Sequence, residues 1–464
     1  MAEHLDLDID GLVEPYRTKV VERIRLLSRA DRARVLHDAG YWIVHLASAD
    51  VFIDLITDSG TGAMSDEQWA GMMRGDEAYM GSRNFFHFQK TVQEIFGYRH
   101  VIPTHQGRAA EHIAMELLAQ PGQMVLNNTH FDTTRAHVEN RKAIPVDLVG
   151  DVLWDFERTE PFKGNFDLAR LQTALERHRD KIAFIAITVL NNFACSSPVS
   201  MANIREVRRL ADKFGVAVYF DACRFAENAH FIKAREPGYQ DRSIPEIVRE
   251  MMSYGRGCWV SAKKDGLVNI GGFIAVDDEA LARRCQERLV LYEGFPTYGG
   301  LARRDLEAMA IGLREVLDED YLASRVAQSA YLGGLFREAG VVVSQPTGGS
   351  GVFIDVSSIY PHLPAEHFPG IALSCDLYLE GGIRAGAAPL HVNLLDARTG
   401  EIESKIFQFA RFAIPRRVYN KSHLEYVAKV VARVKTKAAH SRGYKIVTTS
   451  EILPHFFSTF APIT

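Results

Sequence analysis

Short apolar runs alternate with helical stretches from residue 101 onward, and this alternation restricts the fold more than any other feature of the sequence. The runs contain few polar residues, as expected for strands that are buried on both faces. They lie at 124–127, 182–190, 216–220, 259–261 and 273–276. Stretches with helical periodicity lie between several of them, at 109–119, 168–178, 202–214 and 243–254. The pattern predicts an α/β fold with a mostly parallel sheet.

The rest of the chain predicts a second, smaller domain. Residues 15–49 indicate one or two amphipathic helices, and residues 305–323 indicate one long helix. Beyond residue 328 the pattern favours an α+β unit with strands near Val341 and Phe353. The chain has 464 residues, 47% of them hydrophobic, which is enough for two domains. We expect a large domain at 58–312 and a small domain that combines 1–57 with 313–464.

Composition excludes several classes of protein. The net charge is -4 and no basic block is present, so nucleic acid is not an expected partner. The acidic N-terminus lacks the apolar core of a signal peptide, and no apolar run is long enough to span a membrane. The five cysteines are scattered and form no Cys-x-x-Cys pair, which predicts a protein of the reducing cytoplasm. We expect neither a zinc site nor a disulfide framework. Without a Gly-x-Gly-x-x-Gly motif or a Walker loop, a dinucleotide or ATP enzyme is not expected.

Two adjacent lysines, Lys263 and Lys264, follow the predicted strand at 259–261. A buried lysine is costly unless it forms a covalent bond or an ion pair. An enzyme that uses pyridoxal 5'-phosphate (PLP) needs one lysine to carry the cofactor, and Ser261 with the other lysine could bind its phosphate. An ordinary solvated strand end explains this motif equally well.

The other groups that PLP needs also have candidates near predicted strand ends, where ligands of open α/β sheets bind. Asp221 could hold the protonated pyridine nitrogen, with Arg224 near the phenolic oxygen; alternatively, Asp221 caps a helix. Gln106-Gly107-Arg108 precedes a predicted helix, whose N-terminus would attract a phosphate. Phe131 could stack on the cofactor ring, although an aromatic residue there could equally belong to the core.

Longer strings extend this pattern over nearly the whole chain, from about Thr57 to His455. They lie at 57–61, 75–79, 103–108, 226–233, 261–265 and 293–300. Together they resemble the β-eliminating lyases of tryptophan and tyrosine, the family of tryptophanase and tyrosine phenol-lyase. The resemblance implies a PLP-dependent fold-type I enzyme, with a large α/β domain like that of aspartate aminotransferase and a smaller α+β domain. It also implies a carbon–carbon lyase that assembles as a homotetramer, a dimer of dimers.

The resemblance also implies a role for each matching residue. Lys264 corresponds to the lysine that carries PLP and removes the α-proton of the substrate. The remaining cofactor contacts are the phosphate ligands Gln106, Gly107, Arg108, Ser261 and Lys263, the stacking Phe131, the ring-nitrogen partner Asp221, and Asn192 and Arg224 at the phenolic oxygen. Arg411 resembles the clamp for the substrate carboxylate, for which the planar guanidinium is suited. Thr57, Ser59 and Phe295 correspond to further substrate contacts.

Tyr79 resembles the acid that protonates the leaving group, supplied by a neighbouring subunit. Gly60, Glu77 and Asn269 match the family's site for a potassium or ammonium ion. Two further positions distinguish the sister enzymes: tryptophanase has aspartate after the stacking phenylalanine and histidine near the C-terminus. This chain has Asp132 and His455 there, which resembles tryptophanase, and the two residues are assigned to proton transfer.

Three segments differ from the family where it contacts the substrate: 194–198 (Ala-Cys-Ser-Ser-Pro), 348–350 (Gly-Gly-Ser) and 386–389 (Gly-Ala-Ala-Pro). In the third, a glutamate common to both sister enzymes is replaced, so Gly386, Ala387 and Ala388 indicate a wider, less polar pocket. A pocket that loses its fitted polar groups loses discrimination. We therefore expect β-elimination that yields pyruvate and ammonia, with a leaving group other than indole or simple phenol. A carbon–sulfur lyase, a β-replacement synthase and a PLP-binding protein without turnover are the alternatives.

Overall fold

The computed structural model describes residues 13–450 and 454–464, without the side chains of 387–391, 454 and 455. Its strands in the main sheet are β1 (Ile53–Leu55), β2 (His100–Thr104), β3 (Met124–Asn127), β4 (Ile144–Asp147), β5 (Ile182–Thr188), β6 (Val218–Asp221), β7 (Gly257–Ser261), β8 (Gly272–Val276), β9 (Gly351–Asp355), β10 (Ile383–Leu395) and β11 (Ile402–Ala413). In the described residues these eleven strands follow the order β2-β8-β7-β6-β5-β3-β4-β10-β11-β9, and β1 pairs with β10.

The centre of the sheet is parallel. Strands β4, β3, β5, β6 and β7 pair side by side in the same direction, and only β8 runs against its neighbours β7 and β2 in this half. This confirms the predicted α/β fold with a mostly parallel sheet. All five predicted apolar runs form strands, and β3 has the predicted bounds. The carboxyl ends of β3, β5, β6 and β7 therefore meet at one edge of the sheet.

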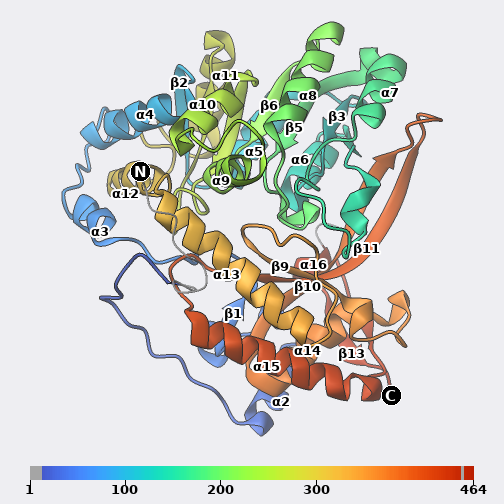
Figure 1. Cartoon of the computed structure of the whole chain (residues 1–464). Helices are drawn as coiled ribbons and strands as arrows, with labels where there is room; N and C mark the ends of the chain where they lie inside the picture. Colours follow the sequence, from blue (N-terminus) through green and yellow to red (C-terminus); the bar gives the residue numbers. More distant parts are fainter. Residues whose placement is uncertain (1–12, 451–453) are drawn as a thin grey trace.

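Helices cover both faces of this sheet (Figure 1). On β8, Phe273 and Ala275 belong to one core, whereas Ile274 and Val276 belong to another, as the two-residue period of a strand requires. The first core includes α4 (Arg83–Phe96), α7 (Leu168–His178), α8 (Met201–Phe214), α9 (Phe225–Arg235), α10 (Ile244–Ser253) and α12 (Arg303–Glu315). The second includes α5 (Gly107–Leu118), α6 (Asp132–Asn140) and α11 (Glu279–Tyr292).

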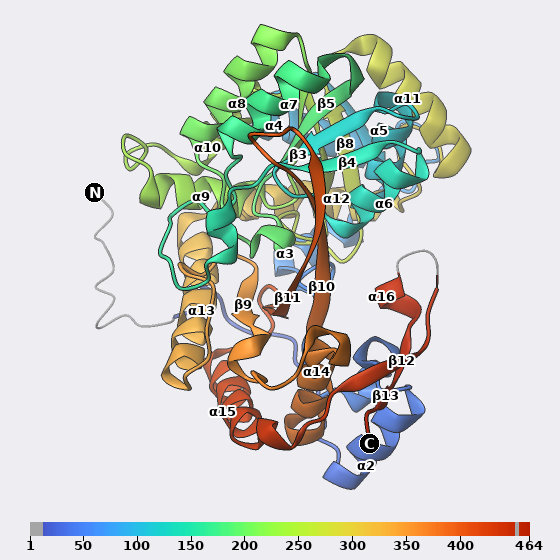
Figure 2. The same ribbon diagram turned by 90° about the vertical axis from the view of Figure 1, so that its right-hand side faces the viewer.

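A separate core joins the N-terminal part of the described chain to its last third. It unites β1, β9 and part of β10 and β11 with α2 (Arg29–Asp38), α13 (Glu319–Glu338), α14 (Pro369–Gly381) and α15 (Lys421–Lys437). Figure 2 shows the long β10–β11 hairpin extending from this core toward the large sheet, where Leu394 pairs with Asp147. The proposed boundaries at 57/58 and 312/313 stay predictions. Within the described residues, no helix is long and apolar enough to cross a membrane.

Three sequence-based predictions of local structure need correction. Between residues 15 and 49 the only α-helix in the described residues is α2, because Val20 and Val21 are largely exposed and offer no buried face. The long helix expected at 305–323 is two helices, since Asp318 caps α13 by accepting a hydrogen bond from the Tyr321 amide. The expected strand near Val341 is reduced to one bridge between Val343 and Ile354.

Candidate functional site

Lys264 lies three residues after β7, at the edge where the parallel strands end. Its Nζ atom is 5.8 Å from the centre of the Phe131 ring. Phe131 precedes α6 and stacks on Phe193 with 5.7 Å between ring centres. The amine predicted to carry the cofactor and the ring predicted to stack on it therefore face each other, although 133 residues separate them in the sequence.

Two buried carboxylates lie near this amine. Asp221 is the last residue of β6 and is 3% exposed. Glu111 of α5 accepts hydrogen bonds from Thr133 (2.6 Å) and Thr134 (2.9 Å), which fixes the start of α6 behind Phe131. Burial, reinforced by the charge of Asp221, raises the pKa of Glu111 to about 7. The negative potential near Asp221 and Glu111 suits a protonated ring nitrogen of the cofactor.

Positively charged side chains gather where α5 begins, beside the end of β7. Gly107 begins α5, and a Cβ atom there would lie 2.4 Å from the Cβ atom of Ser261, so only glycine allows this helix to approach β7. Lys263 and Arg108 border the same helix end; burial and the charges of Lys264 and Arg108 lower the pKa of Lys263. Backbone amides at a helix N-terminus, joined by cations, form a suitable phosphate cradle. The residues present therefore fit PLP.

Arg224 and Asn192 are held by neighbouring side chains. The guanidinium of Arg224 forms two hydrogen bonds with the carboxylate of buried Asp58, at 2.7 and 3.0 Å. The amide oxygen of Asn192 accepts hydrogen bonds from Ser350 (3.3 Å) and Ser196 (3.4 Å). Both candidate contacts of the phenolic oxygen are thus fixed in place by other side chains.

Arg416 is the centre of a buried ionic cluster beneath the site. Its guanidinium contacts Asp58 at 2.9 Å, Glu227 at 2.7 Å and Asp265 at 2.9 Å, and is 2% exposed. Burial by itself raises the pKa of the Asp58 carboxyl, but the positive charges of Arg224 and Arg416 hold this pKa well below its usual range. Burial and the charge of Glu227 raise the pKa of Asp265 to about 7. Because Asp265 follows Lys264 directly, the cluster links the lysine loop to Asp58 and to the segment after β11.

The predicted carboxylate clamp lies on β11, next to the loop after β1. Arg411 donates a hydrogen bond to the carbonyl oxygen of Ile56 at 2.6 Å. The next residue is Thr57, whose hydroxyl oxygen accepts the amide hydrogen of Ser59 at 3.1 Å. Arg411 forms no ion pair within the described part of the chain, so its guanidinium keeps donors for a carboxylate. The structure therefore brings Arg411, Thr57 and Ser59 together.

The three segments that differ from the family fall into two places. Ser196 and Ser350 hydrogen-bond each other, and the Gly349 amide donates to the Ser196 carbonyl oxygen at 3.2 Å, so the first two segments form one unit beside Asn192. In the third, Gly386 pairs with Arg411 across β10 and β11. Ala387 and Ala388 continue this strand, opposite Ala410 and Phe409. Their side chains lie outside the described residues.

Tyr79, Phe295 and Glu77 lie at another place, on an exposed rim of the chain. Tyr79 is 60% exposed, and its hydroxyl is 3.3 Å from that of Tyr298. Its ring centre is 6.3 Å from that of Phe295. Glu77 accepts hydrogen bonds from the Arg303 and Arg304 amides and thereby caps α12.

Of the predicted cation ligands, Gly60 and Asn269 are adjacent. The Asn269 side-chain amide donates to the Gly60 carbonyl oxygen at 3.1 Å. Of the two residues assigned to proton transfer, Asp132 begins α6 directly after Phe131. His455 belongs to α16 (Pro454–Phe457), and its side chain lies outside the described residues.

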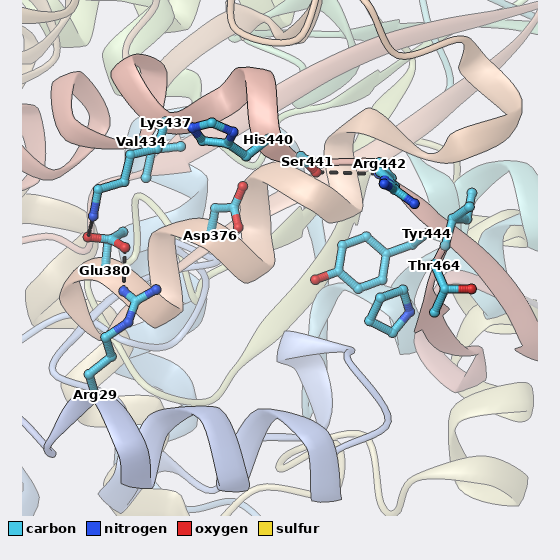
Figure 3. Close-up of a pocket in the computed structure, with 13 residues that line it drawn as sticks. Arg29, Asp376, Glu380, Val434, Lys437, His440, Ser441, Arg442, Tyr444 and Thr464 are labelled. Carbon is cyan, nitrogen blue, oxygen red and sulfur yellow. Dashed lines mark hydrogen bonds and ion pairs between the residues drawn. The ribbon is translucent and has the colours of Figure 1, made fainter.

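A hollow in the surface of the small domain lies away from all of these residues (Figure 3). Charged side chains line it, and several of them have partners in the structure. Glu380 forms ion pairs with both Arg29 and Lys437, and Asp376 accepts a hydrogen bond from Tyr360 at 2.7 Å. None of the predicted site residues lines the hollow, so it gives no support to a catalytic site there.

Sequence analysis did not assign the residues that support the site: Asp58, Glu111, Arg416, His105 and Glu293. A signal was present for some of them. Asp58, His105 and Glu293 lie inside the strings that carry the family resemblance, next to residues that received a role. Glu111 and Arg416 lie outside those strings, and only their contacts in three dimensions identify them.

Comparison with known proteins agrees with this arrangement. The model of the family described as beta-eliminating lyase matches residues 54–430. The chain is 48% identical over 454 residues to tryptophanase of Salinibacter ruber (98% of this chain, 96% of the relative) and 45% identical over 451 residues to tyrosine phenol-lyase of Symbiobacterium thermophilum (97% and 98%). Serine palmitoyltransferase of Sphingomonas wittichii shares the fold at 13% identity, with a TM-score of 0.53 over 83% of this chain and 88% of that one. The chain therefore belongs to the β-eliminating lyase family.

Proposed function

We propose that this protein uses PLP to eliminate the β-substituent of an L-amino acid, with pyruvate and ammonia as the other products. The observation that supports this most directly is the position of the Lys264 amine over the Phe131 ring. Asp221 ends β6, and the helix end at Gly107 packs against Ser261 of β7, so an acidic and an anion-binding group occur at the same edge of the sheet. This polarity matches a cofactor with a basic ring nitrogen at one end and a phosphate at the other.

When bound, PLP withdraws electrons from the α-carbon of the amino acid. The residues of this chain would bind the substrate and move its protons. Arg411 binds the α-carboxylate with its free guanidinium hydrogens, which orients the α-hydrogen. Lys264 removes that hydrogen as a general base, and Tyr79, with Asp132 and His455 where they reach the leaving group, supplies a proton to it.

The exposed position of Tyr79 supports a site that is assembled from two copies. Its rim is rich in exposed apolar side chains, including Trp69 at 52% and Met73 at 87%, more than a free surface usually carries. We propose that a second copy covers this rim and that Tyr79 reaches its active site, in a homotetramer built from dimers. In that assembly, a potassium or ammonium ion would bind at Gly60, Asn269 and Glu77. The cytoplasmic location also stays a prediction.

The altered segments argue for an unusual leaving group. Gly386 offers no side chain beside Arg411, and Ser196 with Ser350 replaces the family's residues beside Asn192. Tryptophan and tyrosine are therefore expected to be poor substrates. An amino acid with a bulkier or modified β-substituent is expected to be a good one.

A pyruvate assay tests this proposal. The panel holds tryptophan, tyrosine, S-substituted cysteines and bulkier aromatic amino acids, each with and without an added thiol nucleophile. Pyruvate without the thiol indicates elimination, and loss of pyruvate with a new amino acid indicates β-replacement. The combined change Gly386→Val, Ala387→Glu and Ala388→Ile should raise indole release from tryptophan. A natural enzyme that already cleaves tryptophan or tyrosine with kcat/KM above about 10⁴ M⁻¹s⁻¹ would contradict the substrate proposal.

A further inference from the structure

The side chain of Gln106 is held by its neighbour, although its position before α5 would allow it to cap the helix. Its amide makes no hydrogen bond to the helix that it precedes. The amide nitrogen instead lies 2.9 Å from Nε2 of His105. The Gln106 backbone is fixed as well, since it bridges to Gly271 and its carbonyl oxygen accepts the hydroxyl hydrogen of Thr104 at 3.0 Å.

His105 is in turn held by Glu293. The Glu293 carboxylate accepts the His105 amide hydrogen at 3.0 Å and also contacts Nδ1 of the ring. The Glu293 side chain is 9% exposed, so its charge is shielded from water. A buried carboxylate is stable only with such partners, and both of these partners belong to His105.

A glycine-rich turn brings Glu293 to this position. Gly299 has φ +55°, and a Cβ atom there would lie 2.0 Å from the carbonyl oxygen of Pro103, so the turn at 293–300 packs directly on the end of β2. Only glycine permits both the conformation and this approach. The same turn contains Tyr298, which contacts Tyr79.

The contacts of His105 with Glu293 and Gln106 fit one tautomer of the neutral ring. A carboxylate can only accept, so Nδ1 of His105 must donate to Glu293. In the neutral ring Nε2 is then an acceptor, and the Gln106 amide must donate one of its two hydrogens to it. The second amide hydrogen remains for a ligand at the start of α5, where Gly107 and Lys263 lie.

We infer that His105, fixed by Glu293, is a positioning residue that turns the Gln106 amide nitrogen toward the phosphate of PLP. This inference rests on the proposed function, in which Gln106 is a phosphate ligand. Without the acceptor at Nε2 of His105, the Gln106 amide is free to turn its oxygen toward the phosphate. The amide oxygen and a phosphate oxygen, both acceptors, would then face each other. His105 therefore contributes to binding of the phosphate and not to binding of the cofactor ring.

Pyridoxal, which lacks the phosphate, separates this role from a general structural one. The affinities of the apoenzyme for PLP and for pyridoxal are measured by absorbance titration for the natural protein, His105→Phe, Gln106→Ala and the double variant. His105→Phe should weaken PLP binding about 10-fold or more, as expected for a charge-assisted hydrogen bond, and leave pyridoxal binding within twofold. His178→Phe is the matched control, because His178, the last residue of α7, is also half-buried and hydrogen-bonds through Nε2 to the Gly400 carbonyl oxygen.

The outcomes distinguish the inference from the proposed function. Equal losses for PLP in both single variants, with no further loss in the double variant, support the inference. A loss with Gln106→Ala but not with His105→Phe overturns it and leaves the phosphate site intact. Equal losses for PLP and pyridoxal in His105→Phe also overturn it. Unchanged PLP binding in Gln106→Ala refutes the phosphate assignment itself. If His105→Phe does not fold, Glu293→Ala tests the same link and should weaken PLP alone.

Discussion

Gly107→Ala is the most direct test of the close contact between α5 and β7. The added Cβ atom would lie 2.4 Å from the Cβ atom of Ser261, where ordinary contacts begin at 3.4 Å, so the helix end must move by about 1 Å. A shift of this size takes a hydrogen bond of about 2.9 Å out of range. One lost hydrogen bond to a charged group costs about 1.5–3 kcal/mol, which weakens PLP binding about 10- to 150-fold.

The assay is a titration of the apoenzyme with PLP, followed by absorbance, with thermal unfolding of the same samples. Gly334→Ala on α13 is the control, because the nearest atom to its added Cβ is 3.9 Å away. This control should bind PLP normally and unfold at the same or a slightly higher temperature, since alanine favours a helix over glycine by about 0.5–1 kcal/mol. PLP binding within twofold of the natural protein in Gly107→Ala would refute the predicted cradle.

Three further changes test other parts of the site. Lys264→Ala should abolish turnover, and after borohydride reduction no pyridoxyl-lysine peptide should be found; such a peptide at another lysine would contradict the assignment. Arg411→Ala should lower kcat/KM by about 30- to 5,000-fold, from a loss of about 2–5 kcal/mol for a buried charge pair; steady-state kinetics with unchanged kcat/KM would assign the clamp elsewhere. The folded apoenzyme keeps a proton on Glu111 up to a pKa of about 7, whereas the unfolded chain releases it near the usual value of 4.5. Stability should therefore fall as pH rises through this window, and Glu111→Gln should flatten that slope in urea unfolding.

Local patterns predicted the parts of the fold that depend on neighbouring residues. The apolar run at 124–127 is β3, and the helical stretch at 168–178 is α7, with the predicted bounds. The break at Asp318 was missed because the helical pattern continues across it, and one side-chain cap decides the boundary. The long strands β10 and β11 were not predicted either.

The candidate site was predictable only in part, for a similar reason. Lys264, Asp221 and Arg411 could be assigned a role by resemblance to the family. Their supports are pairs far apart in the sequence, such as Arg224 with Asp58, 166 residues away. No spacing or periodicity in one sequence identifies such a pair.

The buried ionic cluster around Arg416 also restricts how such an enzyme can evolve. Loss of one member unbalances the buried charges of the others, and breaking a buried ion pair costs about 3–5 kcal/mol, comparable to much of a protein's net stability. Selection is therefore expected to remove single mutations at Asp58, Glu227, Asp265 or Arg416. The neighbouring Lys264, and the chemistry that depends on it, would be preserved together with the cluster. Segments 194–198, 348–350 and 386–389 contain no member of the cluster. Mutations that change the range of substrates can accumulate in these segments without removing a member of the cluster.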